Sequence, residues 1–326
     1  MKNSFFNKNK WKIAGILVTA IIILNSCFQT RNMKNSEYEY VLYWDHVVLI
    51  KYIGRDTTVQ IPEHILGRPV TVLGRECFSE NENIEEVMIS GSVIDVEESA
   101  FFDCKNLKKV TLGTNMKYTG EFMFSDCIAL EEVIIPKGIE EIRYGSFDGC
   151  VSLSQCVLPD TIRSISETAF GWCDFEKMTI PETLKYIGRD AFRGNTWKLK
   201  QSGAVVCGKN IMIDYNGNES TVFVPEGVET VVGMMWNNEN IHELYMPNTA
   251  TTIYDTFVGG QTITLFIPDS ILNLDVGYCD ENVKIVTTKD SYAEQYAIEK
   301  GIAYEIVDDV QALYDAALER QKAGQD

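Results

Sequence analysis

The amino-acid sequence predicts a mainly β solenoid, in which one coil of 21–23 residues recurs about nine to ten times along the chain. Two observations lead to this prediction. Seven of the eight prolines fall in one frame, and a row of phenylalanines keeps a spacing of 22 or 23 residues over the same region. Self-similarity at a fixed period is the sequence signature of a protein whose coils stack on one another.

Each proline of this frame is expected to end one short strand, because proline has no amide hydrogen to donate to a β-ladder. From Pro136 onward the steps are 23, 22, 44, 22 and 21 residues, and Gly203 falls at the midpoint of the 44-residue step. Before Pro136, the positions of the missing prolines are taken by Ser90 and Gly113. The frame comprises Pro62, Pro136, Pro159, Pro181, Pro225, Pro247 and Pro268.

Two further ladders keep the same period and predict how each coil is filled. Four cysteines recur every 23 residues, each of them three residues after a phenylalanine. We expect these side chains to fill the turn of each coil, with the thiols free and buried as small hydrophobes. One coil cannot bury them alone, but stacked coils can. This structural ladder comprises Phe101, Phe124, Phe147, Phe170, Phe192, Cys104, Cys127, Cys150 and Cys173.

The repeat that begins at Leu130 reads LEEVIIPKGIEEIRYGSFDGCVS, and the next two follow the same pattern, LxxVxIPxxVxxIxxxAFxxCxx. This pattern closely resembles the BspA-like leucine-rich repeat family, over roughly residues 48–306. The resemblance implies a right-handed solenoid and a surface or envelope protein that binds a partner, with adhesion to extracellular matrix proteins or to cells as the usual role. A parallel β-helix is the alternative architecture, but the single Ile-Pro strand and the fixed Phe-Cys turn of each coil fit it less well.

The amino terminus predicts export. Four lysines without an acidic residue precede Ile13–Leu24, an apolar run of 12 residues that is too short for a membrane-spanning helix of about 20. We therefore interpret residues 1–26 as a signal peptide. The sequence Leu24-Asn25-Ser26-Cys27 resembles the lipobox of bacterial lipoproteins, which implies lipidation at Cys27; an ordinary secretory signal is the alternative. The residue after Cys27 is Phe28 and not the aspartate that keeps a lipoprotein from reaching the outer membrane. The resemblance therefore implies an outer-membrane or cell-surface location.

The remaining boundaries follow from local composition. Residues 27–40 are predicted to form a polar tether, and residues 41–306 to form the solenoid. Within the solenoid, residues 203–218 break the repeat and read as a hairpin. Residues 290–306 predict a short capping helix followed by a last strand. Residues 307–326 predict an amphipathic helix packed on the last coil, then a frayed tail.

Composition and residue types argue against a nucleic-acid partner and against catalysis. The formal net charge of −18 repels nucleic acid. The three histidines, His46, His64 and His242, share no repeat position, so nothing places one of them beside a nucleophile. The chain has no C-x-x-C pair and no phosphate-binding fingerprint. We therefore expect no catalytic residue, no metal and no cofactor.

The outward face of the repeated strand is the candidate binding surface. In each strand the residue between two core positions faces outward, as Ile134 does between Val133 and Ile135. Contiguous exposed apolar surface is commonly a partner site, although strands also favour β-branched and aromatic residues for their own sake. The candidate partner-binding residues of this row are Met88, Ile134, Val157, Phe223 and Tyr245.

These observations predict an exported, lipid-anchored binding or adhesion module rather than an enzyme. Its expected partner is a protein of the extracellular matrix or of a cell surface, or a glycan. A polysaccharide-binding or polysaccharide-cleaving envelope protein is one alternative, although the sequence shows no row of acids and bases that would line a cleft. A structural component of the envelope is the other.

Overall fold

The computed structural model describes residues 31–326 except residue 177 and residues 234–239, 255–261, 278–281 and 325–326. It is a β-solenoid of about 11 turns with 9% helix, which confirms the predicted fold class. The predicted number of coils, about nine to ten, is slightly lower than this. The predicted signal peptide and Cys27 lie outside the described residues.

The amino-terminal end is covered by antiparallel strands, not by a tether. The segment predicted as tether, residues 27–40, contributes β1 and most of β2 from residue 31 on. Asn35 closes the turn between them by accepting hydrogen bonds from two backbone N–H groups, and Tyr38 of β2 is only 1% exposed. The elements here are β1 (Arg31–Lys34), β2 (Tyr38–Leu42), β3 (Val47–Tyr52), β5 (His64–Ile65), β6 (Arg68–Leu73) and β8 (Asp95–Val96). The pairs β1–β2, β2–β3 and β5–β6 are antiparallel, whereas β3–β6 and β6–β8 are parallel and lead into the coils.

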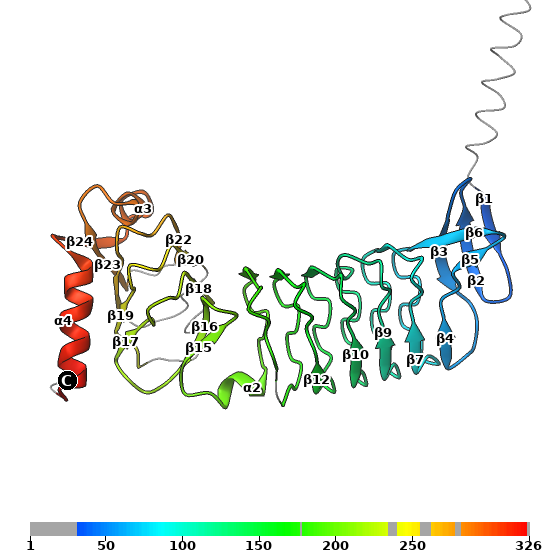
Figure 1. The fold of residues 1–326 in the computed structure, drawn as a ribbon, viewed down its shortest axis with the longest axis horizontal. Helices are drawn as coiled ribbons and strands as arrows, with labels where there is room; N and C mark the ends of the chain where they lie inside the picture. The colour runs from blue at the N-terminus through cyan, green and yellow to red at the C-terminus, as the bar shows by residue number, and fades with distance from the viewer. Residues whose placement is uncertain (1–30, 177, 234–239, 255–261, 278–281, 325–326) are drawn as a thin grey trace, which may run out of the picture.

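The following coils form the first stack, with one parallel sheet on each of two faces (Figure 1). The strand before each proline position supplies one sheet, and a two-residue strand after the turn supplies the other. The first sheet comprises β4 (Thr58–Gln60), β7 (Glu86–Met88), β9 (Lys109–Thr111), β10 (Glu132–Ile134) and β12 (Gln155–Cys156). The second comprises β11 (Glu141–Ile142), β13 (Ser164–Ile165) and β14 (Tyr186–Ile187).

The proline frame marks a recurring turn. The N–H of Ile162 donates to the carbonyl of Pro159 at 3.1 Å, and the same bond recurs after Pro136, Pro181, Pro225, Pro247 and Pro268. Ser90 and Gly113 make it too, with N–O distances of 3.2 and 3.3 Å, so their predicted equivalence to proline is confirmed. Gly203 is the exception, because it begins a strand instead of a turn.

The phenylalanine ladder is a continuous stack of rings inside the first stack. Successive rings from Phe78 to Phe192 lie 4.6–5.8 Å apart, with interplanar angles of 3–20°. Tyr52 closes the stack at the amino-terminal end, and Trp197 meets Phe192 edge-on at the other. The fixed 23-residue period thus places one ring directly over the next.

The cysteine ladder runs beside the rings and is hydrogen-bonded to the backbone of the phenylalanines. Each thiol donates to the carbonyl oxygen of a phenylalanine in the preceding coil, at 3.1–3.2 Å. In the last coil of the stack Asn195 takes the cysteine position, and its amide donates to the carbonyl of Phe170 at 2.7 Å. All seven described cysteines are free and buried.

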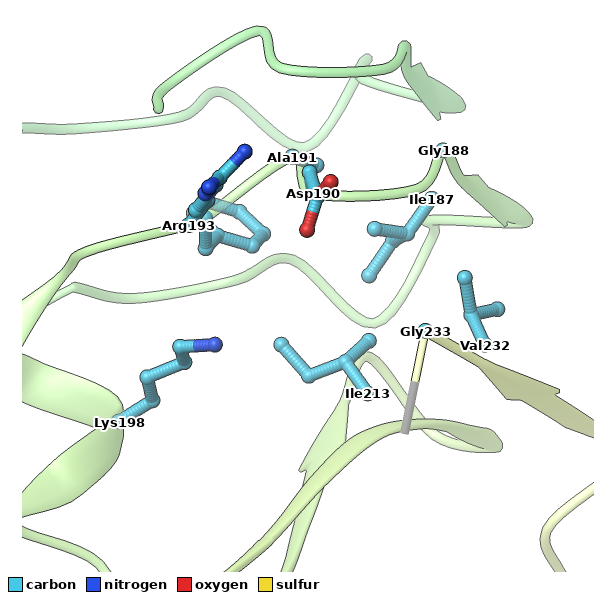
Figure 2. Close-up of a pocket in the computed structure, with 10 residues that line it drawn as sticks. Ile187, Gly188, Asp190, Ala191, Arg193, Lys198, Ile213, Val232 and Gly233 are labelled. Carbon is cyan, nitrogen blue, oxygen red and sulfur yellow. The ribbon is translucent and has the colours of Figure 1, made fainter. Parts of the chain in front are cut away.

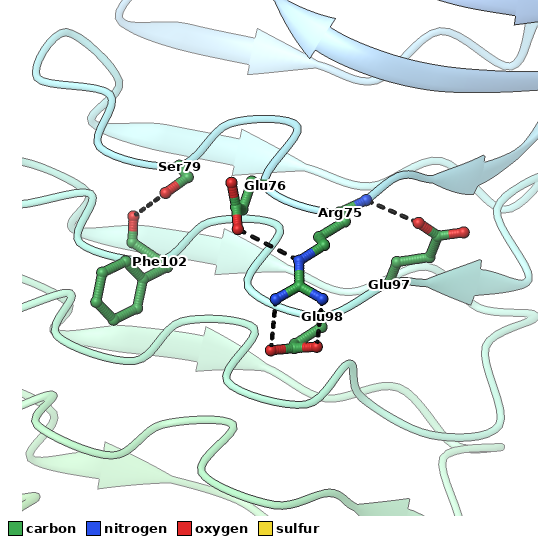
Figure 3. A network of polar contacts seen from close by, with 6 residues as sticks. All are labelled: Arg75, Glu76, Ser79, Glu97, Glu98 and Phe102. Carbon is green, nitrogen blue, oxygen red and sulfur yellow. Dashed lines mark hydrogen bonds and ion pairs between the residues drawn. The ribbon is translucent and has the colours of Figure 1, made fainter.

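Polar contacts on the solvent side also join successive coils. The Arg75 guanidinium pairs with Glu98 of the next coil at 2.9 Å, and the backbone N–H of Arg75 donates a hydrogen bond to the Glu97 carboxylate (Figure 3). Ser79 donates in the same direction, to the carbonyl of Phe102. Exposed pairs of this kind contribute at most about 1 kcal/mol each, so the buried ladders dominate stability.

The repeat breaks after Phe192, where the direction of stacking changes (Figure 1). A short helix, α2 (Thr196–Leu199), replaces the strand of that coil. It is followed by the predicted hairpin, formed by β15 (Gly203–Cys207) and β16 (Ile211–Asn216), whose antiparallel pairing confirms that prediction. The hydrophobic core divides at this point into two clusters.

The second stack again has two sheets. Its strands in the pre-proline position are β17 (Thr221–Phe223), β19 (Glu243–Tyr245), β21 (Ile263–Phe266), β23 (Val283–Thr288) and β24 (Ala303–Val307). The other sheet comprises β15, β16, β18 (Thr230–Val232), β20 (Thr252–Tyr254) and β22 (Asn273–Asp275). The helix α3 (Tyr292–Lys300) connects β23 to β24 and buries Ala293 and Ala297 in the second core cluster.

The predicted helix is present as α3, and both of its ends are capped. The Ser291 hydroxyl accepts a hydrogen bond from the N–H of Glu294, and Gly301 ends the helix in the left-handed conformation. The predicted last helix is present as α4 (Val310–Lys322), but it covers more of the solenoid than predicted. It does not only pack on the last coil: it runs back across the strands of the second stack, and Gln321 reaches the carbonyl of Thr221 in β17.

Candidate functional site

The outward face of β4, β7, β9, β10 and β12, which we call the open strand face, is not covered by any described element. Ile134 and Val157 are neighbours on it, and their side chains are 42% and 78% exposed. Lys109 and Glu132 form an ion pair of 2.9 Å on the same face. The arrangement is a small apolar centre with a charged border.

Met88, the remaining candidate in the first stack, is only half-buried on this face, and Thr111 separates it from Ile134. Beyond Val157 the row continues to the exposed Thr179 and is then interrupted by α2. The structure therefore groups Ile134 and Val157, with Met88 further along the same face.

The two aromatic candidates lie on the second stack, where Tyr245 is buried and Phe223 is partly buried. Phe223 stacks on Tyr245 with a centroid separation of 5.0 Å, and Tyr245 stacks on Phe266 at 3.9 Å. We call these three rings the covered stripe, because α4 lies on them and leaves Tyr245 only 4% exposed. The prediction that Phe223 and Tyr245 present an open outward surface is therefore wrong, although both do point away from the solenoid core.

Tyr314 of α4 makes the central contact with the covered stripe. Its ring meets Phe223 edge-on at 5.4 Å, and its hydroxyl donates to the carbonyl of Val224 at 3.0 Å. Burial raises the pKa of Tyr314 to about 12. Leu313, Ala317 and Leu318 complete the small apolar cluster between helix and sheet.

A pocket forms where the repeat breaks. Figure 2 shows Asp190 and Lys198 on its opposite walls, with Ile213 beside them. It adjoins a larger pocket of about 230 Å³ that shares Asp190, Arg193 and Lys198. Lys198 is already paired with Asp214 at 2.8 Å. This ion pair leaves little unbalanced charge to attract a ligand. We therefore interpret the pocket as a gap in packing where the two stacks meet.

The described residues offer no evident reactive centre. No group of three or more potential metal-ligating side chains occurs among them. Burial raises the pKa of the Cys156 and Cys207 thiols to about 12, and it also raises that of the ladder thiols Cys127, Cys150 and Cys173. A thiol must lose its proton to attack a substrate or bind a metal, so these cysteines are suited to packing.

Comparison with known proteins identifies the repeat. Residues 71–200 match the family model described as the BspA type leucine rich repeat region, in six copies. No curated protein matches the chain.

Several solved structures resemble the chain. One is a leucine rich cell surface protein from Faecalibacterium prausnitzii, 19% identical over 78% of each chain, with a TM-score of 0.45. A leucine-rich repeat protein from Bacteroides ovatus is 19% identical over 85% of this chain and 65% of its own, with a TM-score of 0.40. The pneumococcal vaccine antigen PcpA is 13% identical over 86% and 99%, with a TM-score of 0.41.

Among the described residues, none of the helices combines the length and the apolar character that a membrane crossing requires.

Proposed function

We propose that this protein is a non-catalytic binding module of a bacterial cell envelope, and that the open strand face receives a protein partner. The observation that carries the proposal is the contrast between the two stacks. The apolar row of the second stack is covered by the chain's own helix α4, whereas Ile134 and Val157 in the equivalent row of the first stack remain exposed.

The composition of the open strand face fits a protein partner better than a polysaccharide. Protein interfaces typically combine an apolar centre with a polar rim, as Ile134, Val157 and the Lys109–Glu132 pair do. A polysaccharide would call for exposed aromatic rings, and the aromatic residues of this row belong to the covered stripe. The proposed ligand class is therefore a protein of the extracellular matrix or of a cell surface.

The proposal is tested by measuring binding of the chain without residues 1–27, which retains every described residue, to an array of matrix glycoproteins, mucins and polysaccharides. The double change Ile134→Glu and Val157→Glu should weaken binding to a protein ligand at least about tenfold, because it places two charges in the apolar centre. Ile94→Glu, an exposed residue outside this face at 53%, is the matched control.

Equal affinity of the double variant and the Ile94→Glu control would remove the open strand face from the site. Binding to polysaccharides alone, or loss of the polysaccharide during incubation, would favour the carbohydrate alternative. The absence of any ligand in the array would favour a structural role in the envelope.

The proposal includes export and lipid anchoring at Cys27, which rest on the basic start, the apolar run and the lipobox-like sequence. Acyl chains contribute about 0.8 kcal/mol for each buried CH₂ group, so several chains give stable anchoring. Cys27→Ser should move the protein from the membrane fraction to the soluble or secreted fraction, as followed by immunoblotting. An unchanged membrane fraction would contradict lipid anchoring at this residue without affecting the assignment of the binding face.

A further inference from the structure

Two turns at the amino-terminal end of the solenoid carry large apolar side chains that are exposed to solvent. Trp44 lies in the tight turn between β2 and β3, which the N–H of Tyr43 closes by donating to the carbonyl of His46 at 2.9 Å. Leu66 lies in the turn between β5 and β6. Trp44 is 61% exposed and Leu66 is 64% exposed, so neither side chain belongs to the core.

The backbone conformation of Leu66 is unusual for a leucine. Leu66 and Gly67 have φ values of 50° and 76°, so both central residues of the turn are in the left-handed region. Turns of this kind between paired strands prefer asparagine or aspartate before the glycine, because those residues tolerate this conformation. A leucine that is neither buried nor in a favoured conformation indicates a contact outside the chain.

The strand pairing places both turns at the edge where the chain enters β1. Arg31, the first residue of β1, lies opposite Leu42, two residues before Trp44. Because β3 pairs parallel with β6, the turns that precede these two strands lie at the same end of the sheet. The Arg68 side chain joins the two turns by donating to the carbonyl of Trp44 at 2.8 Å. We call Trp44 and Leu66 the cap tip.

The lipid anchor of the proposed function would reach this same end of the molecule. Cys27 precedes Arg31 by four residues, which span at most about 14 Å when fully extended. Acyl chains on Cys27 would thus hold the cap tip at the membrane surface, and the inference rests on that anchoring. The coils lead away from this end of the solenoid (Figure 1).

The charges near the cap tip do not oppose contact with a membrane that contains anionic lipids. Residues 31–70 contain five cationic and five acidic side chains, so the negative excess of the chain, with its net charge of −18, lies beyond them. Arg31 is exposed, and Asp45, the acidic neighbour of Trp44, is hydrogen-bonded to the His46 ring at 2.6 Å. Tryptophan is enriched at membrane interfaces, where its ring lies among apolar groups and its N–H stays hydrated.

We propose that the cap tip is a membrane-contact surface, which inserts Trp44 and Leu66 into the headgroup region of the membrane that holds the lipid anchor. Two side chains contribute too little to bind a free protein to lipid. A short tether keeps the tip and the lipid at a high effective concentration, so a weak contact is sufficient. The contact limits rotation about the tether and directs the coils, with the open strand face, away from the lipid.

The test uses vesicles of phosphatidylethanolamine and phosphatidylglycerol with a nickel-chelating lipid, and an amino-terminal histidine tag in place of residues 1–27. Because the tag supplies the tether, the result does not depend on lipidation of Cys27. Brominated lipids quench a tryptophan that enters the bilayer, so they should lower the emission of the tethered protein. Trp44→Ser should abolish this loss. Trp172→Ser, which removes a 53% exposed tryptophan from the first stack, should leave it unchanged.

Leu66→Asn separates membrane contact from a structural role of this side chain. Asparagine suits the left-handed conformation, so the variant should unfold at a temperature no lower than that of the wild type. It should nevertheless reduce the quenching at least about twofold, because one leucine is lost from the membrane interface.

Equal emission on brominated and unbrominated vesicles would overturn the proposal, since it would show that the tethered cap tip does not enter lipid. So would quenching that Trp172→Ser removes and Trp44→Ser does not, or quenching that Leu66→Asn leaves unchanged. The membrane fraction of Cys27→Ser tests the anchor itself, so each of the two proposals can fail without the other.

Discussion

Replacing Phe147 with alanine should lower the free energy of unfolding by about 3–5 kcal/mol, the usual range for deleting a buried ring. Phe147 is fully buried, and its ring stacks on Phe124 at 5.5 Å and on Phe170 at 5.2 Å. Since each coil of a solenoid contacts only its neighbours, no distant part of the chain can fill the resulting cavity. Urea unfolding followed by circular dichroism measures the loss.

The same deletion at Phe102 is the matched control. Phe102 stands next to the ladder residue Phe101, but it is only half-buried and is not one of the rings of that stack. Phe102→Ala should therefore cost less than half as much as Phe147→Ala. Equal losses for the two variants would mean that the continuous stack of rings contributes nothing beyond local burial.

The parts of the fold that depend on the repeat period could be predicted from the sequence. With a period of 23 residues, Phe101 and Phe124 occupy the same position in successive coils, so their rings must lie one above the other. The structure shows this arrangement. The hairpin of residues 203–218 was also predictable, because Gly208-Lys209-Asn210 is a turn sequence between two apolar pairs. Such local and periodic signals do not depend on which distant surfaces meet.

The amino-terminal strands were missed, although a local signal for them exists. Tyr38, Tyr40 and Leu42 alternate with polar or smaller residues, which is the period of a strand. The polar composition of residues 28–37 outweighed this signal and led to the interpretation as a tether. In the structure Tyr38 and Tyr40 are 1% and 4% exposed, because they cover the first turns of the solenoid.

The candidate site was predicted only in part, because the sequence does not show which surfaces the other elements cover. Alternation along a strand shows that Tyr245 points away from the core, but it does not show whether another element covers that side. The helical spacing of Leu313, Tyr314 and Ala317 indicates an apolar face on α4 without specifying the surface that it meets. Only the folded chain shows that these two apolar surfaces, which are far apart in the sequence, meet each other.

Replacing Tyr314 with alanine should release α4 from the covered stripe. The variant loses the buried ring, at about 3–5 kcal/mol, and the hydrogen bond to the carbonyl of Val224. An isolated helix of 13 residues is marginal in water, so α4 should unfold once its main contact is gone. Hydrogen exchange of residues 310–322 should accelerate, and a fluorescent apolar dye should bind the uncovered rings of Phe223 and Tyr245.

Tyr314→Phe is the informative control, because it keeps the ring and removes the hydroxyl. The pKa of Tyr314 is raised from 10.0 to about 12 in the folded protein, and an acid with a raised pKa loses its stabilising contribution as pH increases above the unfolded value. Wild type should therefore lose stability relative to Tyr314→Phe between pH 10 and about 12, as measured by urea unfolding of both proteins at pH 9 and pH 11. A stability difference that stays constant over this range would show that the hydroxyl is not buried against the sheet, and slow exchange in α4 of Tyr314→Ala would show that other contacts hold the helix.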